Sequence, residues 1–288
     1  MKNNRFIARP GKNVKLADFD PSYTGKFQSR EQATAKLERD IVRLAKYQDT
    51  LYAQNTQALL VIFQAMDAAG KDGTIKHVMS GVNPQGTQVF SFKGPSAEEL
   101  DHDYLWRCYK ALPERGRIGI FNRSYYEEVL VVRVHPEILK SAQLPKDSFK
   151  GIWNTRFEQI NNFERYLVQN GIQVMKFYLN VSKEEQKRRF LARIERPEKN
   201  WKFSLNDAKE RGHWDDYMKA YEDVFKHTST RWAPWHIIPA DNKWFTRMTV
   251  ADLIVDKLKS MKLHYPSVSE QHLLELMKAK EALENEPK

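Results

Sequence analysis

The chain has a single cysteine, Cys108, among its 288 residues, and this scarcity excludes an intrachain disulfide framework. A reducing compartment suits such a composition. Residues 1–12 are basic but contain no apolar run of signal-peptide length, and no stretch approaches the roughly 20 apolar residues that cross a bilayer. We therefore expect a cytoplasmic protein with no membrane partner, and Cys108 as a small packed residue within a helix.

Two kinds of catalytic pattern are also missing. The histidines stand apart from the cysteine and carboxylate spacings that are typical of zinc sites. No G-x-S-x-G or comparable nucleophile motif occurs. The sequence therefore indicates neither zinc chemistry nor a covalent enzyme intermediate.

Positive charge is in excess, because 47 Lys and Arg face 37 Asp and Glu for a formal net charge of +10. This favours a polyanionic partner, for which nucleic acid, inorganic phosphate chains and nucleotides all qualify. Binders of single-stranded nucleic acid usually add aromatic stacking platforms to a basic track. Here most aromatic residues recur at helical spacing and are expected in the core, so we predict no nucleic-acid partner. The clearest are Trp106, Tyr109, Phe157, Phe163, Tyr217 and Tyr221, whereas Trp201 lies in a basic segment.

Apolar stretches that alternate with helical patterns predict an α/β fold. Helices are expected to begin after Ser29, Ser96 and Ser182, each followed three residues later by Gln or Glu as in a capping box. A further helix within residues 147–170 is closed by Gly171. The expected buried strands are residues 58–65, 87–92, 117–121, 173–179 and 235–239. The chain should form a three-layer sandwich around a five-stranded, mostly parallel sheet.

The strand at residues 58–65 leads into Met66-Asp-Ala-Ala-Gly-Lys-Asp-Gly73, which predicts a phosphate-binding loop before a helix. Gly70 and Lys71 fit the pattern G-x-x-x-x-G-K-[ST]. Ala65 replaces its first glycine, however, and Asp72 replaces its metal-binding hydroxyl. Asp67 adds a carboxylate among amides that attract anions, which makes electrostatic sense if a divalent cation lies between carboxylate and phosphate. The alternative is an ordinary strand-to-helix turn with a surface lysine.

Polar residues also follow the expected strand at 117–121, at the edge where open α/β sheets bind ligands. Asn122 occupies the place where phosphate-binding folds often have a metal-steering aspartate, and its amide can ligate or orient a water. Arg123 offers a planar fork of donors that suits phosphate oxygens. Its alternative role is to pair with Glu127 or Glu128 on the following turn.

Three motifs in one frame resemble the polyphosphate kinase 2 family: Met66–Gly73, Phe121–Glu128, and Glu185–Arg189 continued by Trp201–Phe203. The similarity covers nearly the whole chain. It implies a P-loop kinase of the thymidylate-kinase type that depends on Mg²⁺, with Mn²⁺ as a possible substitute. It further implies reversible phosphate transfer between inorganic polyphosphate and purine nucleotides by a homo-oligomer, either a dimer or a tetramer.

The resemblance also implies roles for individual residues. The catalytic set is Asp67, Lys71, Arg123, Arg189 and Arg193, and the metal set is Asp67 and Asn122. The substrate-binding set is Ala68, Ala69, Gly70, Asp72, Gly73, Asn122, Glu127, Arg188 and Lys202. Spacing alone leaves open which of the arginines face phosphate. Many family members have asparagine where Glu127 stands, and the acidic form resembles the subgroup that accepts both nucleoside mono- and diphosphates.

One domain is expected over residues 1–288, with an N-terminal arm and helix at 1–55 and a helical tail at about 267–288 that could mediate subunit contacts. Residues 184–214 are rich in Lys and Arg and are interrupted by Pro197. Nucleotide kinases carry a lid after the corresponding strand, which excludes water from the transferring phosphate. The alternative is a solvated charged face.

Two other functions remain open from the sequence. An ATP-dependent nucleoside monophosphate kinase would need a pocket for the donor's nucleobase. A non-catalytic polyanion-binding protein would show affinity without turnover. Asp67 disfavours the second alternative, because a polyanion binder gains nothing from a carboxylate inside its phosphate loop.

Overall fold

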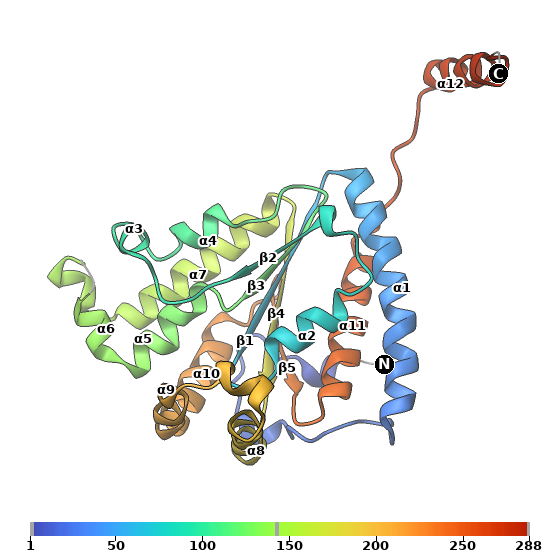
Figure 1. The fold of residues 1–288 in the computed structure, drawn as a ribbon. Helices are drawn as coiled ribbons and strands as arrows, with labels where there is room; N and C mark the ends of the chain where they lie inside the picture. Colours follow the sequence, from blue (N-terminus) through green and yellow to red (C-terminus); the bar gives the residue numbers. More distant parts are fainter. Residues whose placement is uncertain (1–2, 142–143, 287–288) are drawn as a thin grey trace.

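A computed structural model describes residues 3–141 and 144–286, and its centre is one five-stranded sheet (Figure 1). The strands are β1 (Ala58–Ala65), β2 (Thr87–Ser91), β3 (Ile118–Asn122), β4 (Ile172–Asn180) and β5 (Trp235–Pro239). Their order is β2-β3-β1-β4-β5, and every neighbouring pair is parallel. The predicted sheet is therefore confirmed.

Burial differs between the centre and the edge of the sheet. All eight residues of β1 are buried, and Phe63 stacks on Phe177 of β4 with 5.3 Å between ring centroids. β2 has a strand neighbour on one side only, so its residues are half-buried or exposed, and Val89 is 50% exposed. The expectation that residues 87–92 form a buried strand was therefore wrong in burial but correct in position.

Helices cover both faces of the sheet, which confirms the three layers (Figure 1). On one face lie α1 (Arg30–Gln54), α2 (Lys71–Val78) and α11 (Lys243–Ser260), with α1 packed on α11. On the other lie α7 (Ile152–Gln169) and α10 (Trp214–Thr228). The remaining helices are α3 (Ala97–Leu100), α4 (Trp106–Lys110), α5 (Val131–Val134), α6 (Pro136–Ser141), α8 (Lys183–Ile194), α9 (Leu205–Glu210) and α12 (Glu270–Glu284).

The expected helix starts are found, but only one carries a complete capping box. At α3, Ser96 accepts from the backbone of Glu99 and the Glu99 side chain accepts in return. At α1, Ser29 accepts from Gln32, whose side chain accepts from Gln28 rather than from Ser29. At α8, Ser182 accepts from the Glu185 backbone at 3.1 Å. Each hydroxyl still satisfies one N–H that the helix leaves unpaired.

The long helix expected within residues 147–170 starts later than predicted. Gly151 has φ 67 and separates α7 from a short 3₁₀ turn, Lys146–Phe149. A left-handed residue interrupts helical hydrogen bonding, so α7 begins at Ile152. Gly171, with φ +87, follows its end as expected.

The N-terminal arm and the C-terminal tail are held very differently. In the arm, Ala8 donates to Trp235 O at 2.9 Å, and Phe6 and Ala8 are buried, so the arm packs beside β5. The tail helix α12 has no buried residue and projects from the body (Figure 1). No helix in the described part of the chain is both long and apolar enough to span a membrane.

The residues expected in the core differ in burial, and Trp106 and Phe163 are only half-buried. Cys108 is fully buried in α4, as predicted, and Phe157, Tyr217 and Tyr221 are buried as well. Tyr109 is 53% exposed, because it lies on the outer side of the short helix α4, so its expected core position was wrong.

Candidate functional site

The carboxyl ends of the parallel strands meet at one edge of the sheet, and the candidate site is built on it. The loop at residues 66–70 follows β1, and Arg123 follows β3. α8 begins shortly after β4, and α11 begins shortly after β5. The topology thus brings together four segments that are far apart in the sequence.

The loop between β1 and α2 has the backbone of a phosphate cradle. Ala68 and Gly70 have φ 59 and φ 107, which turns the chain sharply before α2 begins at Lys71. The N-terminus of α2 therefore presents N–H groups that have no intrahelical partner, an arrangement that binds phosphate. Lys71 Nζ donates to Ala65 O at 3.0 Å. Burial, together with the neighbouring charge of Arg123, lowers the pKa of Lys71 to about 8.

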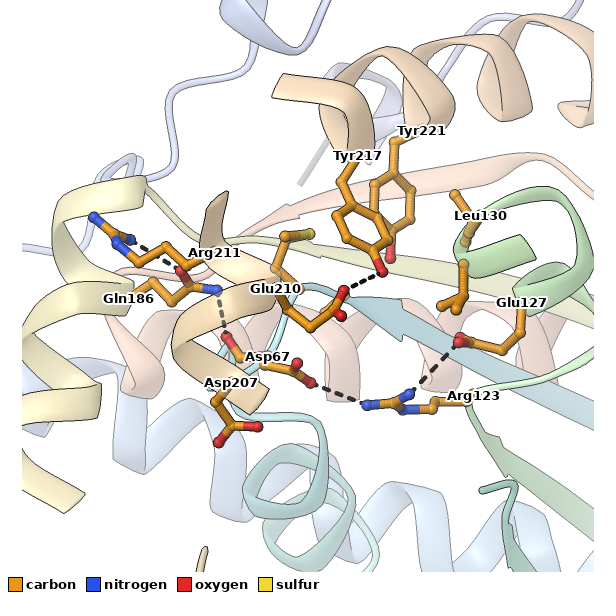
Figure 2. A pocket seen from close by; sticks show the side chains of 13 residues that line it. Asp67, Arg123, Glu127, Leu130, Gln186, Asp207, Glu210, Arg211, Tyr217 and Tyr221 are labelled. Carbon is orange, nitrogen blue, oxygen red and sulfur yellow. Dashed lines mark hydrogen bonds and ion pairs between the residues drawn. The ribbon is translucent and has the colours of Figure 1, made fainter. Parts of the chain in front are cut away.

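Arg123 links the phosphate loop to the end of β3 (Figure 2). Its guanidinium lies 3.0 Å from Asp67 Oδ1 and 3.5 Å from Glu127 Oε2. The charge of Glu127, followed by that of Asp67, raises the pKa of Arg123 above its ordinary value. Of the two partners that the sequence allowed, Glu127 and Glu128, Arg123 pairs with Glu127. It also pairs with Asp67, which the spacing did not predict.

Arg189 of α8 lies under the phosphate loop with every N–H donor engaged. Nη1 donates to Ala68 O at 2.9 Å and Ala69 O at 2.7 Å. Nη2 donates to Ala240 O at 2.6 Å and Asp241 O at 3.0 Å, and Nε donates to Glu185 at 2.7 Å. The side chain is 5% exposed. In this arrangement Arg189 supports the loop, and no N–H remains for a phosphate.

The other expected lid cations lie nearer to solvent. Arg188 forms a bidentate pair with Glu185 and its side chain is 69% exposed. Arg193 donates to Lys202 O at 3.1 Å and lies 3.5 Å from Asp207 Oδ2. Arg188, Arg193 and Lys202 therefore lie along one wall of an open groove.

The groove runs past the phosphate loop and has a volume of about 900 Å³. Its described lining includes eleven Lys and Arg side chains but only three Asp, so it is strongly cationic. The basic lining residues are Lys71, Lys93, Arg123, Arg188, Arg189, Arg193, Arg196, Lys199, Lys202, Lys243 and Arg247.

Three of these cations were missed in the sequence. Lys93 follows β2, and Lys243 and Arg247 lie four residues apart on the first turns of α11. Burial lowers the pKa of Lys243 to about 8, and the neighbouring charge of Arg189 acts in the same direction. The available signal was the position of Lys243 just beyond the expected strand at 235–239, at the same sheet edge.

A second, smaller space of about 40 Å³ lies on the other side of the phosphate loop (Figure 2). Asp67, Arg123 and Glu127 line it from the sheet edge, and Glu210 and Tyr217 line it from the expected lid and α10. Glu210 accepts from the Tyr217 hydroxyl at 2.8 Å. Burial and this carboxylate raise the pKa of Tyr217 well above its ordinary value. Tyr217 was expected only as core, because helical spacing does not show which buried ring borders a cavity.

The sequence model of a family described as Polyphosphate kinase 2 (PPK2) matches residues 27–266. The chain belongs to the polyphosphate kinase 2 family. This match covers the sheet, the phosphate loop, both walls of the groove and the small cavity.

Relatives in this family align over almost the full chain. An ADP-polyphosphate phosphotransferase of Rhodopseudomonas palustris is 50% identical over 98% of this chain and 99% of its own length. An AMP/ADP-polyphosphate phosphotransferase of Meiothermus ruber is 41% identical over 91% of this chain and 95% of its own length. The crystal structure of polyphosphate kinase 2 from Arthrobacter aurescens TC1 superposes with a TM-score of 0.86 at 38% identity, covering 96% of this chain and 98% of that chain.

Most residues expected in the site gather at the carboxyl edge of the sheet. Asp72 and Asn122 are joined by a hydrogen bond of 2.7 Å beside the loop, and both line the groove with Gly70 and Gly73. Within the described ranges, no group of three or more His, Cys, Asp or Glu suited to a metal is present.

Proposed function

We propose that this polyphosphate kinase 2 transfers the terminal phosphate of inorganic polyphosphate to purine nucleotides, converting ADP to ATP and AMP to ADP in a reversible reaction. The observation that carries the proposal is the meeting of two spaces at the phosphate loop. Asp67, Arg123 and Asp207 line both the cationic groove and the small cavity. A donor in one space and an acceptor in the other would meet beside Lys71.

The groove takes the polyphosphate chain. A linear polyanion needs a continuous track of cations and no base-specific pocket, and the eleven Lys and Arg of the lining supply such a track. Arg188, Arg193 and Lys202 contact the chain from one wall. The N–H groups of α2 and Lys71 hold the terminal phosphoryl group, where negative charge develops during transfer.

The small cavity takes the phosphate of the nucleotide. Arg123 turns its fork of donors toward this phosphate, while Asp67 and Glu127 hold the guanidinium in place. A cavity of about 40 Å³ has room for water but not for a nucleotide. Residues 184–214 therefore act as a lid that opens for the nucleotide and closes to exclude water.

Mg²⁺ is the proposed metal, with Mn²⁺ as a substitute. Mg²⁺ binds through one or two carboxylates together with substrate phosphates, and Asp67 and Asn122 supply oxygen donors of this kind at the sheet edge. The donor chemistry of the site therefore fits the ion. When bound, the ion would help to neutralise the charge that develops on the transferring phosphoryl group. The protein's own part is to hold the two phosphates in line, with no covalent intermediate.

The proposed location is the cytoplasm, which the free cysteine supports. The proposed assembly is a homo-oligomer, either a dimer or a tetramer, which the exposed helix α12 supports. Light scattering coupled to size-exclusion chromatography measures the assembly directly.

Acceptance of AMP is proposed to depend on Glu127. After Asp67, Glu127 is the carboxylate nearest to Arg123. Replacing Glu127 by Asn removes its charge, so the position in which Arg123 binds a nucleoside monophosphate should change. We expect Glu127→Asn to lower the ratio of AMP to ADP activity by about tenfold, or about 1.4 kcal/mol in relative barriers. Glu184→Asn, on the exposed first turn of α8, is the control. An unchanged ratio would remove Glu127 from the explanation.

The decisive assay incubates purified protein with Mg²⁺, long-chain polyphosphate and, separately, AMP, ADP, GMP and GDP, and separates the nucleotides afterwards. The proposal expects polyphosphate-dependent formation of the next higher phosphate. Turnover with ATP but not polyphosphate would favour a nucleoside monophosphate kinase. Polyphosphate binding without any turnover would favour a polyanion-binding protein.

A further inference from the structure

Arg123, which lines the small cavity, has an unusual backbone conformation. Its φ of 66 lies in the left-handed region, which residues other than glycine rarely adopt and which costs free energy. The Arg123 N–H donates to Phe63 O at 3.0 Å, and the hydroxyl of the next residue, Ser124, accepts from Gln64 Nε2 at 3.3 Å. Such a conformation persists only where the surrounding structure holds the chain on both sides of it.

The 3₁₀ turn that follows Arg123 lies against a buried ion pair. Tyr125 and Tyr126 begin this turn, and both of their hydroxyls donate to Glu164 Oε1 of α7, at 3.0 and 2.7 Å respectively. The other oxygen, Glu164 Oε2, accepts from Lys176 Nζ of β4 at 2.6 Å. Both charged side chains are fully buried. The turn is therefore attached to α7 and β4 through one carboxylate.

The ammonium group of this pair is fully hydrogen-bonded. A lysine has three N–H donors, and those of Lys176 reach the carboxylate, the Tyr126 hydroxyl at 2.9 Å and Thr228 O at 2.7 Å. Thr228 is the last residue of α10, which also carries Tyr217 of the small cavity (Figure 2). The ion pair thus connects two of the elements that line this cavity.

Stability alone does not account for a charged pair at this position. Burying two charges removes them from water, and an apolar pair of similar volume is often as stable. A carboxylate can accept from both tyrosine hydroxyls, however, which an apolar side chain cannot do. What the charged pair adds is a fixed position for the turn, and with it for Arg123 and its partner Glu127.

We propose that Glu164 and Lys176 are positioning residues for nucleotide binding, which hold Arg123 in its left-handed conformation beside the small cavity. The inference rests on the proposed function for the identity of the ligand. Arg123 is only one of the eleven Lys and Arg that line the polyphosphate groove. Loss of this support should therefore weaken binding of the nucleotide and leave binding of polyphosphate nearly unchanged.

Calorimetric titration with ADP and, separately, with long-chain polyphosphate, both in the presence of Mg²⁺, measures the two affinities without turnover. We expect Tyr126→Phe to raise the Kd for ADP by about tenfold and that for polyphosphate by less than about twofold, as for loss of one hydrogen bond to a charged group. Tyr178→Phe is the matched control, because this tyrosine is also fully buried and its hydroxyl lies 3.8 Å from the Met218 sulfur. It should leave both affinities unchanged.

Two double variants separate positioning from stability. Lys176→Met/Glu164→Gln removes both charges but keeps an oxygen that accepts from the tyrosines, so it should bind ADP within about threefold of the original protein. Lys176→Met/Glu164→Met removes this acceptor as well and should raise the Kd for ADP by about tenfold. Neither variant leaves a buried charge without its partner, so we expect both to fold, which thermal unfolding checks.

Several outcomes would overturn the inference. Equal ADP affinity of the two double variants, or an unchanged Kd for ADP in Tyr126→Phe, would show that the pair supports only the fold. A parallel loss of ADP and polyphosphate affinity would indicate a general displacement of the sheet edge instead. Absence of ADP binding by the original protein would also overturn it.

The remaining outcomes are equally decisive. Should either Tyr126→Phe or Lys176→Met/Glu164→Met fail to fold, the other variant decides. If the affinities change as expected but polyphosphate drives no nucleotide phosphorylation, only the proposed function fails.

Discussion

The phosphate loop and the outer part of the expected lid both present groups suited to phosphate, yet they are held in opposite ways. Gln186 donates to Asp67 O at 3.0 Å, and Arg189 binds the two following carbonyls, so the loop is supported by largely buried side chains. In the lid, Trp201 and Leu205 are 79% and 80% exposed. The phosphate loop is thus fixed by buried contacts, as a preorganised site requires, whereas this outer part of the proposed lid lies largely in solvent.

Helix α8 connects these two regions. Arg189 and Arg193 lie one helical turn apart on it, and they were assigned the same role in the sequence. Arg189 is directed under the phosphate loop, while Arg193 contacts Lys202 O and lies near Asp207 at the groove wall. A movement of the lid about α8 would therefore displace Arg193 more than Arg189. The following substitutions test this division, beginning with the largest expected effect.

Lys71→Ala should nearly abolish transfer, because it removes the buried charge at the preorganised loop. We expect kcat with polyphosphate and ADP to fall by about 10³-fold, the upper range for loss of one transition-state contact. Lys187→Ala, on the exposed surface of α8, is the control and should retain full activity. Full-speed turnover by Lys71→Ala would contradict the central role of the loop.

Arg189→Ala should reduce both activity and stability, because five hydrogen bonds are lost at a buried position. We expect kcat to fall by about 10²-fold through displacement of the loop. The melting temperature should fall by roughly 5–10 °C, which corresponds to a net loss of about 2.5 kcal/mol at about 2–4 °C per kcal/mol.

Arg189→Lys separates positioning from charge. It keeps the positive charge but cannot donate five hydrogen bonds in one plane. We therefore expect Arg189→Lys to resemble Arg189→Ala in both kcat and melting temperature. Near-normal activity in Arg189→Lys would show that charge alone suffices.

Arg193→Ala should lower activity without lowering stability, whereas replacing a residue that supports the loop, such as Arg189, should lower both. The side chain is 23% exposed, donates one hydrogen bond to the exposed Lys202 O, and lies 3.5 Å from Asp207 Oδ2. We expect the efficiency with polyphosphate to fall by about tenfold, as for one contact of a charged group. The melting temperature should stay within about 2 °C, as for most surface substitutions. A large drop in melting temperature would place Arg193 with the loop-supporting residues.

The difference between these arginines shows where sequence reasoning stopped. Apolar stretches placed all five strands within one or two residues. For four of them the reason is that a buried parallel strand leaves a nearly continuous apolar run, whereas β2 is only half-buried. The glycine and lysine after the first strand are likewise neighbours in the sequence, so the phosphate loop could be placed from the sequence alone. Whether an arginine faces a carbonyl or a solvent groove depends on tertiary contacts such as those of Arg189 with Ala240 and Asp241, which lie about fifty residues away.

The groove wall formed by α11 could not be predicted for a related reason. Lys243 and Arg247 belong to a helix of which half the residues are apolar and most of those are buried, so its sequence indicates a structural role. They border the groove only because β5 ends at the same sheet edge as β1. The small cavity was missed because its lining combines Arg123 with Tyr217, residues of distant segments that carry no common motif.

Raising the pH should weaken polyphosphate binding at the loop and at the groove wall formed by α11, because Lys71 and Lys243 each have a pKa of about 8. At pH 9 about nine-tenths of each free lysine is neutral, so KM for polyphosphate should rise by up to about tenfold per lysine between pH 7 and 9. Lys243→Arg keeps its charge and should show a smaller rise in KM, whereas the control Lys187→Arg should show the same rise as the original protein.

Unfolding at high pH does not explain such a loss of binding. Since the folded pKa of each lysine lies below its ordinary value of 10.5, the unfolded chain binds more protons between pH 8 and 10.5, and these two groups favour folding more as pH rises. A KM that is independent of pH, or an equal rise in Lys243→Arg, would show that these lysines do not bind the phosphate chain.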